Sequence, residues 1–177
     1  AISVPAYAGI PVTHRGVAVS FAVITGHEDP TKPESHVRWQ HLATGVDTLI
    51  FLMGVANLPE ITKNLMDNGR SADTPAAVIR WGTRADQETY VTTLGDAAAM
   101  VQRDGIRPPA IFIVGEVVKL RDQLRWFDRS DIRPLHGKHI LVTRARAQAS
   151  ALTEQLTALG ASCIETPVIR IAPPADG

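Results

Sequence analysis

Charge imbalance, disulfide-forming cysteines and long hydrophobic runs are all missing from this sequence. Its 177 residues include one cysteine and carry a formal net charge of zero. A single cysteine excludes an internal disulfide framework and a cysteine-based zinc site. Zero net charge removes the general electrostatic case for nucleic acid or an anionic membrane as a partner, and no apolar run approaches the ~20 residues of a membrane-spanning helix. We therefore expect a cytoplasmic protein with no nucleic-acid or membrane partner.

Several catalytic motifs are absent as well. The chain contains no GxSxG, P-loop or GxGxxG stretch, so acyl transfer and Walker-type nucleotide hydrolysis lack support. Its six histidines are poorly spaced for a metal, because His36 and His41 lie five residues apart and do not share a helix face. No cysteine or carboxylate cluster supports His136 and His139 either. We expect no metal site.

What the chain does contain is a series of short apolar runs that alternate with helical patterns, which is typical of an α/β fold. Apolar residues at helical spacing predict helices over residues 36–44, 56–69, 95–105 and 119–127. Runs rich in β-branched residues predict strands over residues 18–25, 48–53, 74–83, 87–94 and 107–118. The alternation in residues 87–94 indicates a half-exposed strand that pairs with residues 74–83 as a hairpin. Residues 27–35, which contain Pro30 and Pro33, should form a loop.

The composition changes after residue 128. Residues 129–137 are rich in charged residues and also contain a proline and a glycine, which indicates a linker. Residues 138–177 then follow a strand–helix–strand pattern, typical of the opening βαβ unit of a second doubly wound sheet. We therefore expect two folded parts, residues 1–128 and 138–177, and both ends of the chain look cut from larger domains.

Three of the predicted strands end in a glycine or beside one, at Met53, Gly82 and Gly115. Ligands of open α/β folds bind outside the carboxyl ends of strands, and a missing side chain lets the backbone approach a bound molecule. We therefore expect the three strand ends to lie at one edge and to border a ligand. The alternative for the first strand end is structural: Met53 fills a gap in the core and Gly54 makes the turn.

Residues 1–128 resemble the uroporphyrinogen-III C-methyltransferases of the tetrapyrrole methyltransferase family. The matching stretches are "YAGIPVTHRG", "VITGH", "LIFLMGVANLPEI", "DTPAAVIRWGTRADQ", "TLGD" and "PPAIFIVGEVVKLRDQLRWF". The resemblance implies the second α/β domain of such an enzyme, with a mixed sheet and flanking helices. Residues 135–171 resemble the start of a uroporphyrinogen-III synthase, which implies a fusion in which the opening βαβ unit of a synthase-like domain follows the methyltransferase part.

The same resemblance implies a reaction and its site. Members of the family use S-adenosyl-L-methionine to methylate uroporphyrinogen III at C2 and C7, giving precorrin-2 for sirohaem and cobalamin, and they usually act as homodimers. Matched residue by residue, the resemblance implies that Met53, Gly82 and Ala110 contact the cofactor. In the "THR" stretch, the guanidinium fork of Arg15 suits a substrate carboxylate. We therefore name His14 and Arg15 as candidate substrate contacts, and the alternative for this stretch is a loop that caps the next element.

The resemblance also implies what should precede residue 1. The family's first domain carries a Gly-Gly-Asp cofactor segment and the proposed acid–base residues, so we expect no catalytic residue in this chain and no activity from it alone. The competing interpretation is a non-catalytic α/β module that acts in dimerisation or as a scaffold for its fused partner.

Overall fold

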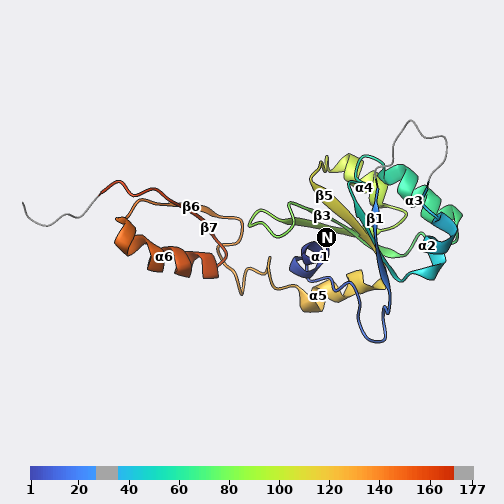
Figure 1. Ribbon diagram of the computed structural model, residues 1–177, viewed down its shortest axis with the longest axis horizontal. Helices are drawn as coiled ribbons and strands as arrows, with labels where there is room; N and C mark the ends of the chain where they lie inside the picture. The colour runs from blue at the N-terminus through green and yellow to red at the C-terminus, as the bar shows by residue number, and fades with distance from the viewer. Residues whose placement is uncertain (27–35, 170–177) are drawn as a thin grey trace, which may run out of the picture. The chain divides into compact units, whose positions relative to one another are not determined.

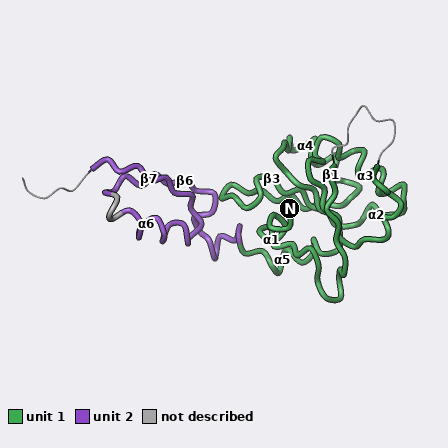
Figure 2. The backbone as a smooth tube through the Cα atoms, viewed as in Figure 1, with its two compact units in different colours: residues 1–126 green, residues 127–177 purple. Residues whose placement is uncertain are grey.

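The computed structural model describes residues 1–26 and 36–169, which form two compact units. The first unit comprises residues 1–126 and the second residues 127–177 (Figure 2). The predicted loop at residues 27–35 lies outside the described residues. No helix in the described part of the chain is long and apolar enough to cross a membrane.

The first unit is built on a five-stranded mixed sheet (Figure 1). The strands lie in the order β1-β2-β5-β3-β4. Their bounds are β1 Phe21–Thr25, β2 Thr48–Leu52, β3 Pro75–Arg80, β4 Glu88–Thr93 and β5 Ala110–Val114. β1 pairs with β2 in parallel, and the predicted hairpin of β3 and β4 is confirmed. β5 runs antiparallel to both β2 and β3, between which it lies, so β2 and β3 point in the same direction.

Helices cover both faces of this sheet. One face is covered by α2, α3 and α4, which pack on Leu49, Phe51 and Phe112. The opposite face is covered by α1 and the short 3₁₀ helix η1, which pack on Ile50 and Ile113. The bounds are α1 Ser3–Tyr7, α2 Trp39–Gly45, α3 Leu58–Asp67, α4 Ala97–Arg103 and η1 Glu116–Leu120. Because successive strand residues point to opposite faces, the continuously apolar β2 and β5 supply both cores at once.

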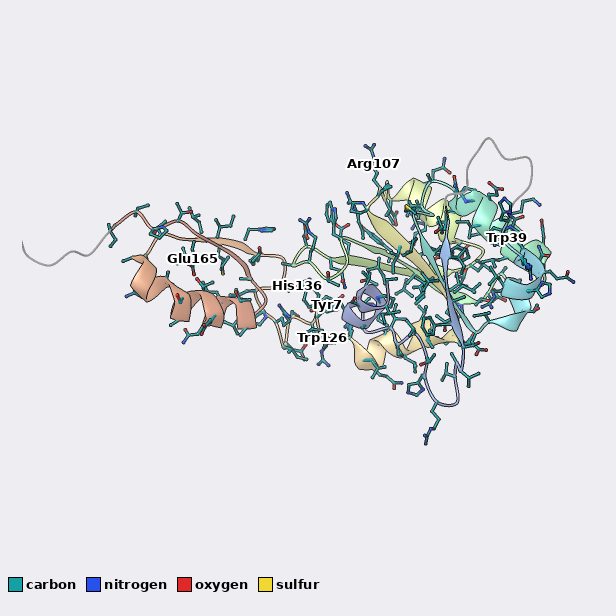
Figure 3. The ribbon with its side chains drawn as sticks, viewed as in Figure 1. Tyr7, Trp39, Arg107, Trp126, His136 and Glu165 are labelled. Carbon is teal, nitrogen blue, oxygen red and sulfur yellow. The ribbon has the colours of Figure 1, made fainter. Side chains whose placement is uncertain are left out.

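The predicted helix over residues 119–127 is wrong in its extent. The chain makes the 3₁₀ turn η1 and then a single α-helical turn, α5 (Arg121–Leu124), before it becomes extended. Contacts with α1 explain the early end: Trp126 Nε1 donates to the Ala6 carbonyl at 3.3 Å, and the rings of Tyr7 and Trp126 lie 5.2 Å apart (Figure 3). These tertiary contacts override the local helical pattern.

The second unit has the predicted strand–helix–strand order. It consists of β6 (His139–Val142), α6 (Arg146–Ala158) and β7 (Ser162–Glu165), and the two strands pair in parallel. Residues 129–137 form consecutive turns that belong to this unit, and the Leu135 amide donates to the Leu159 carbonyl at 2.9 Å. The paired residues Leu141 and Ile164 are both exposed, so one side of the two-stranded sheet is uncovered within the unit.

Candidate functional site

The first unit has an apolar cavity of about 490 Å³ at one edge of its sheet. β2 and β3 end at this edge and β5 begins there, because β5 is antiparallel to both. The cavity is lined by Val4, Leu52, Met53, Val55, Ala56, Ile79, Trp81, Gly82, Arg84, Pro108, Pro109, Ala110 and Ile111. All three residues that the sequence assigns to the cofactor, Met53, Gly82 and Ala110, therefore line one cavity. Its volume lies within the range of about 300–1,000 Å³ that is usual for small-molecule sites.

The third predicted strand end, at Gly115, does not belong to this edge. Since β5 is antiparallel to its neighbours, its carboxyl end lies beside the start of β2. A Cβ at Gly115 would lie 2.8 Å from the Asp47 carbonyl oxygen, so this glycine allows two backbones to pack closely. The prediction that three strand ends meet is thus wrong for Gly115, and the amino end of β5, with Ala110, takes its place.

Three non-glycine residues at the cavity edge have a left-handed backbone. The φ angles are 56° at Met53, 49° at Trp81 and 72° at Thr83. Such conformations are uncommon outside glycine and cost of order 1–3 kcal/mol each, and they cluster at functional sites. Within the described residues, no other non-glycine residue has a positive φ. The strain therefore coincides with the cavity, and this supports a binding role for that edge.

The backbone at Met53 and Gly54 explains this local sequence. The side chain of Met53 is 64% exposed, so the interpretation that it fills a core gap is wrong. Met53, and not Gly54, has the left-handed conformation. The end of the parallel strand β1 packs closely against Gly54: a Cβ at Gly26 would lie 2.5 Å from the Gly54 Cα, and a Cβ at Gly54 would lie 2.9 Å from Ile61 Cδ1. Asn57 Nδ2 donates to the Gly26 carbonyl at 2.9 Å, which fixes the start of α3 to the same junction.

Gly82 packs against helix α1 as well as bordering the cavity. A Cβ at Gly82 would lie 2.3 Å from Val4 Cγ1 and 2.7 Å from Val4 Cγ2. These distances are far below van der Waals contact, so any larger residue must displace Val4 or the β3 end. The absence of a side chain at Gly82 has a structural reason in addition to the predicted approach of a ligand.

The loop from Trp81 to Gln87 carries the polar groups nearest to the cavity. Gln87 is buried, and its Oε1 accepts a hydrogen bond from the Thr83 amide at 2.8 Å. Arg84 lines the cavity and forms a two-point ion pair with Asp86, at 2.9 Å and 3.0 Å. The loop is thus held by its own side chains, and it presents a cation at the rim of an otherwise apolar slot.

His14 and Arg15 lie away from this cavity. Both are exposed in a turn closed by the bridge between His14 and Ala18, and His14 Nδ1 lies 3.0 Å from the Arg15 carbonyl oxygen. This turn leads to Ser20, whose carbonyl accepts the Thr48 amide at the start of β2. A five-residue strand at ~3.3 Å per residue places the first and last residues of β2 about 13 Å apart. The structure therefore does not bring the two candidate substrate contacts together with Met53, Gly82 and Ala110.

Sequence reasoning assigned only Met53, Gly82 and Ala110 to the cavity, and the lining residues that it missed include Val4, Trp81 and Arg84. Trp81 and Arg84 flank the predicted Gly82 in the stretch "RWGTR", so their proximity to the site could have been inferred. Val4 could not, because its contact with Gly82 joins residues far apart in the sequence. Among the described residues, no group of three or more His, Cys, Asp or Glu side chains could hold a metal ion.

Comparison with known proteins places these features in a family. The family model described as Tetrapyrrole (Corrin/Porphyrin) Methylases matches residues 1–98. A Methanosarcina barkeri protein named S-adenosyl-L-methionine-dependent uroporphyrinogen III methyltransferase is 51% identical over 124 residues, which cover 70% of this chain and 49% of the relative. A crystal structure of uroporphyrin-III C-methyl transferase from Thermus thermophilus, complexed with S-adenyl homocysteine, aligns with a TM-score of 0.54 and 31% identity over 67% of this chain and 51% of that chain. The chain thus spans about half the length of these relatives.

A Bacillus subtilis protein named uroporphyrinogen-III C-methyltransferase matches a longer part of the chain. It is 40% identical over 166 residues, which cover 94% of this chain and 34% of that protein. An alignment that covers 94% of the chain extends well into residues 127–177. One relative therefore has counterparts of both units in a single polypeptide.

Proposed function

Because this chain belongs to the tetrapyrrole (corrin/porphyrin) methylase family, we propose that it is the second α/β domain of a uroporphyrinogen-III C-methyltransferase. In this proposal the cavity binds the adenosyl part of S-adenosyl-L-methionine, with Met53, Gly82 and Ala110 in contact with it. The reaction is methylation of uroporphyrinogen III at C2 and C7 to precorrin-2, in the cytoplasm. The observation that carries the proposal is the meeting of these three residues at one apolar cavity.

The lining of the cavity fits an adenosyl group. Leu52, Val55 and Ile79 supply apolar walls, which suit the flat apolar faces of an adenosyl group. When bound, S-adenosyl-L-methionine supplies a methyl group on a positively charged sulfur to a nucleophilic pyrrole carbon. Residues of this chain orient the donor and exclude water, and such positioning accounts for much of the rate in reactions of this kind.

The substrate side of the proposal rests on cationic residues. Uroporphyrinogen III is a polycarboxylate, and Arg15 and His14 are exposed and available to contact it. Arg84 is a second cation at the cavity rim, although a carboxylate there would compete with Asp86 for its guanidinium. We place the acid–base residues of the reaction outside this chain.

Calorimetry tests the cofactor part of the proposal. In a form of the protein that also carries the expected first domain, S-adenosylhomocysteine should bind saturably, with one site per chain, and adenosine should compete for it. The Methanosarcina barkeri relative serves as the positive control for the assay. A protein of this form that gives a normal circular dichroism spectrum but shows no saturable binding would overturn the proposal.

For the second unit, we propose the opening part of a synthase-like domain fused to the methyltransferase. The parallel β6–α6–β7 unit and the long alignment to one relative support it. The exposed pair Leu141 and Ile164 is accounted for if further strands cover it. A form of the protein that carries more of a synthase-like domain after this unit should therefore have a higher unfolding temperature for the unit, and an unchanged temperature would argue against the fusion.

One observation favours a second role, homodimerisation. Strand β1 is at an edge of the sheet, and the alternate residues Val19, Phe21 and Val23 are all exposed. Exposed apolar edge strands are liable to pair with another chain. Sedimentation velocity should give a dimer, and the double variant Val19→Lys/Val23→Lys should give a monomer. A monomeric wild-type protein that still binds S-adenosylhomocysteine would remove the dimer and leave the cofactor proposal standing.

A further inference from the structure

Trp81, which directly follows β3, is held firmly in place by its neighbours. Its amide donates to the Pro109 carbonyl at 3.1 Å, and its own carbonyl accepts the Arg84 amide at 3.1 Å. These two hydrogen bonds hold the residue in the left-handed conformation, with a φ of 49°. An aromatic residue in that conformation is strained, so the surrounding structure maintains a ring position that the local backbone disfavours.

The indole ring is covered on one side by a cation. The Arg80 guanidinium carbon lies 3.7 Å from the centre of the Trp81 ring. Arg80 is itself held by Glu88 at 3.3 Å, and Glu88 also accepts the Tyr90 hydroxyl at 2.8 Å. Burial, together with the hydrogen bond to Glu88, raises the pKa of the Tyr90 hydroxyl, so this hydroxyl acts as a hydrogen-bond donor to Glu88. A chain of interactions from β4 thus fixes the guanidinium over the ring.

Trp81 borders the cavity and Arg80 does not. Trp81 is one of the lining residues, whereas Arg80 is not among them, so the guanidinium covers the ring without occupying the cavity. The lining also includes the apolar residues Val55 and Ala56 from the junction that follows β2. A flat aromatic ligand could enter this space and stack on the indole, since π systems pack well in offset or tilted arrangements.

We propose that Trp81 is the stacking platform for the planar base of the ligand, and that Arg80 is the positioning residue that fixes the platform. This inference rests on the proposed cofactor, whose flat group is adenine. It assigns a role in ligand recognition to two residues of the "RWGT" stretch that precede the predicted contact at Gly82. It also accounts for the strain at Trp81, because a platform that is already fixed loses little conformational freedom when the ligand binds.

Ligand binding to three variants tests the platform. Base stacking on an aromatic residue contributes about 1–3 kcal/mol by alanine substitution, which corresponds to about 5- to 150-fold in affinity. Trp81→Ala should weaken S-adenosylhomocysteine binding by a factor in that range, and Trp81→Phe should retain most of the affinity. Trp81→Gly should also lose affinity while relieving the left-handed strain, so stability and affinity would separate in this variant.

S-Ribosylhomocysteine, which has the sugar and amino acid but no base, is the matched control ligand. It should bind the wild-type chain more weakly than S-adenosylhomocysteine, and Trp81→Ala should not change its affinity further. Equal losses for both ligands in Trp81→Ala would mean that the ring only shapes the cavity, which overturns the inference. If S-adenosylhomocysteine binds neither the wild type nor the variants, the proposed function fails instead.

Fluorescence tests the platform without relying on affinity. The chain has three tryptophans, and Trp39→Phe/Trp126→Phe leaves Trp81 as the single emitter. S-Adenosylhomocysteine should quench this emission, and S-ribosylhomocysteine should not. If that background does not fold, the difference in emission between the wild type and Trp81→Phe gives the same signal. Saturable binding with unchanged Trp81 emission would refute the stacking.

The role of Arg80 has its own test. Arg80→Met removes the cation while keeping apolar contact with the ring, so it should shift the Trp81 emission and weaken S-adenosylhomocysteine binding. Arg80→Lys keeps the charge and should restore part of both. If Arg80→Met changes stability but leaves emission and affinity as in the wild type, Arg80 has only a structural role.

Discussion

Substitution of Gly82 by alanine tests the contact that closes the cavity against helix α1. The new Cβ would lie 2.3 Å, 2.7 Å and 2.9 Å from the Cγ1, Cγ2 and Cβ atoms of Val4. Overpacking of this kind costs about 1–3 kcal/mol, a large share of the ~5–15 kcal/mol that stabilises a typical domain. We therefore expect Gly82→Ala to lower the free energy of unfolding of the first unit by about 1–3 kcal/mol.

The partner substitution Val4→Ala separates this clash from other effects. It removes the two methyl groups that lie nearest to the new Cβ and leaves the 2.9 Å contact. Alone it should cost about 0.8 kcal/mol, since two methyl-sized groups at ~0.8 kcal/mol each are about half-buried. In the double variant the clash is largely relieved, so the two costs should be non-additive by about 1 kcal/mol or more.

Urea unfolding followed by tryptophan fluorescence measures these changes in the first unit alone. All three tryptophans, at positions 39, 81 and 126, belong to residues 1–126. Gly45→Ala is the matched control, because a Cβ at Gly45 meets no atom within 4 Å and alanine favours the helix it ends. If Gly82→Ala unfolds at the same urea concentration as Gly45→Ala, or if the cycle is additive, then Val4 does not pack on Gly82. A double variant that regains stability without affinity for S-adenosylhomocysteine would show that position 82 also borders the ligand.

Three further predictions concern other parts of the first unit. Met53→Ala should weaken S-adenosylhomocysteine binding by about 1–3 kcal/mol with little loss of stability, because the side chain is exposed; a loss of stability at unchanged affinity would contradict this. In a form of the protein that supports turnover, Arg15→Ala should raise the Michaelis constant for uroporphyrinogen III. Arg15→Lys should bring this constant only part of the way back to the wild-type value. Equal effects on cofactor and substrate would indicate a folding role for Arg15. The pKa of Asp47 is lowered by hydrogen bonds from the Val19 and Ser20 amides and the Ser20 hydroxyl. The ionised Asp47 should therefore add to the free energy of unfolding in full above its unfolded pKa of about 3.9, and this stabilisation should be lost as the pH falls through the lowered pKa of the folded state. Asp47→Asn should flatten the stability profile below about pH 4, and an unchanged profile would exclude Asp47 as its source.

Local patterns predicted the elements of the fold better than their directions. The helix at residues 56–69 is observed as Leu58–Asp67, because Pro59 favours a helix start and Gly69 has a φ of +98° suited to a helix end. The direction of β5 was not predictable in the same way. Its run "AIFIV" is apolar on both faces, and such a run is compatible with parallel and antiparallel neighbours alike. That ambiguity is why Gly115 was assigned to the wrong edge.

The candidate site likewise has features that the sequence predicted and one that it did not. The positions of Met53, Gly82 and Ala110 followed from a family resemblance, and the structure brings them to one cavity. The backbone at Trp81 did not follow from anything local, since an aromatic residue is a poor choice for a left-handed position. Residues that break a local preference are expected where function requires it, but only the tertiary hydrogen bonds of the site reveal which residue does so.

The strained backbone at the cavity is supported by the sheet, and this support affects the cost of ligand binding. Met53 and Trp81 directly follow β2 and β3, which are held in register by β5 between them, and the Trp81 amide also donates to the Pro109 carbonyl before β5. The strain is therefore paid during folding and not during binding. A site whose walls are already fixed avoids part of the ordering cost of association, and the apolar lining then contributes through the area it buries. It follows that Trp81→Gly, which removes the ring together with the left-handed strain, should weaken ligand binding more than it lowers the stability of the fold.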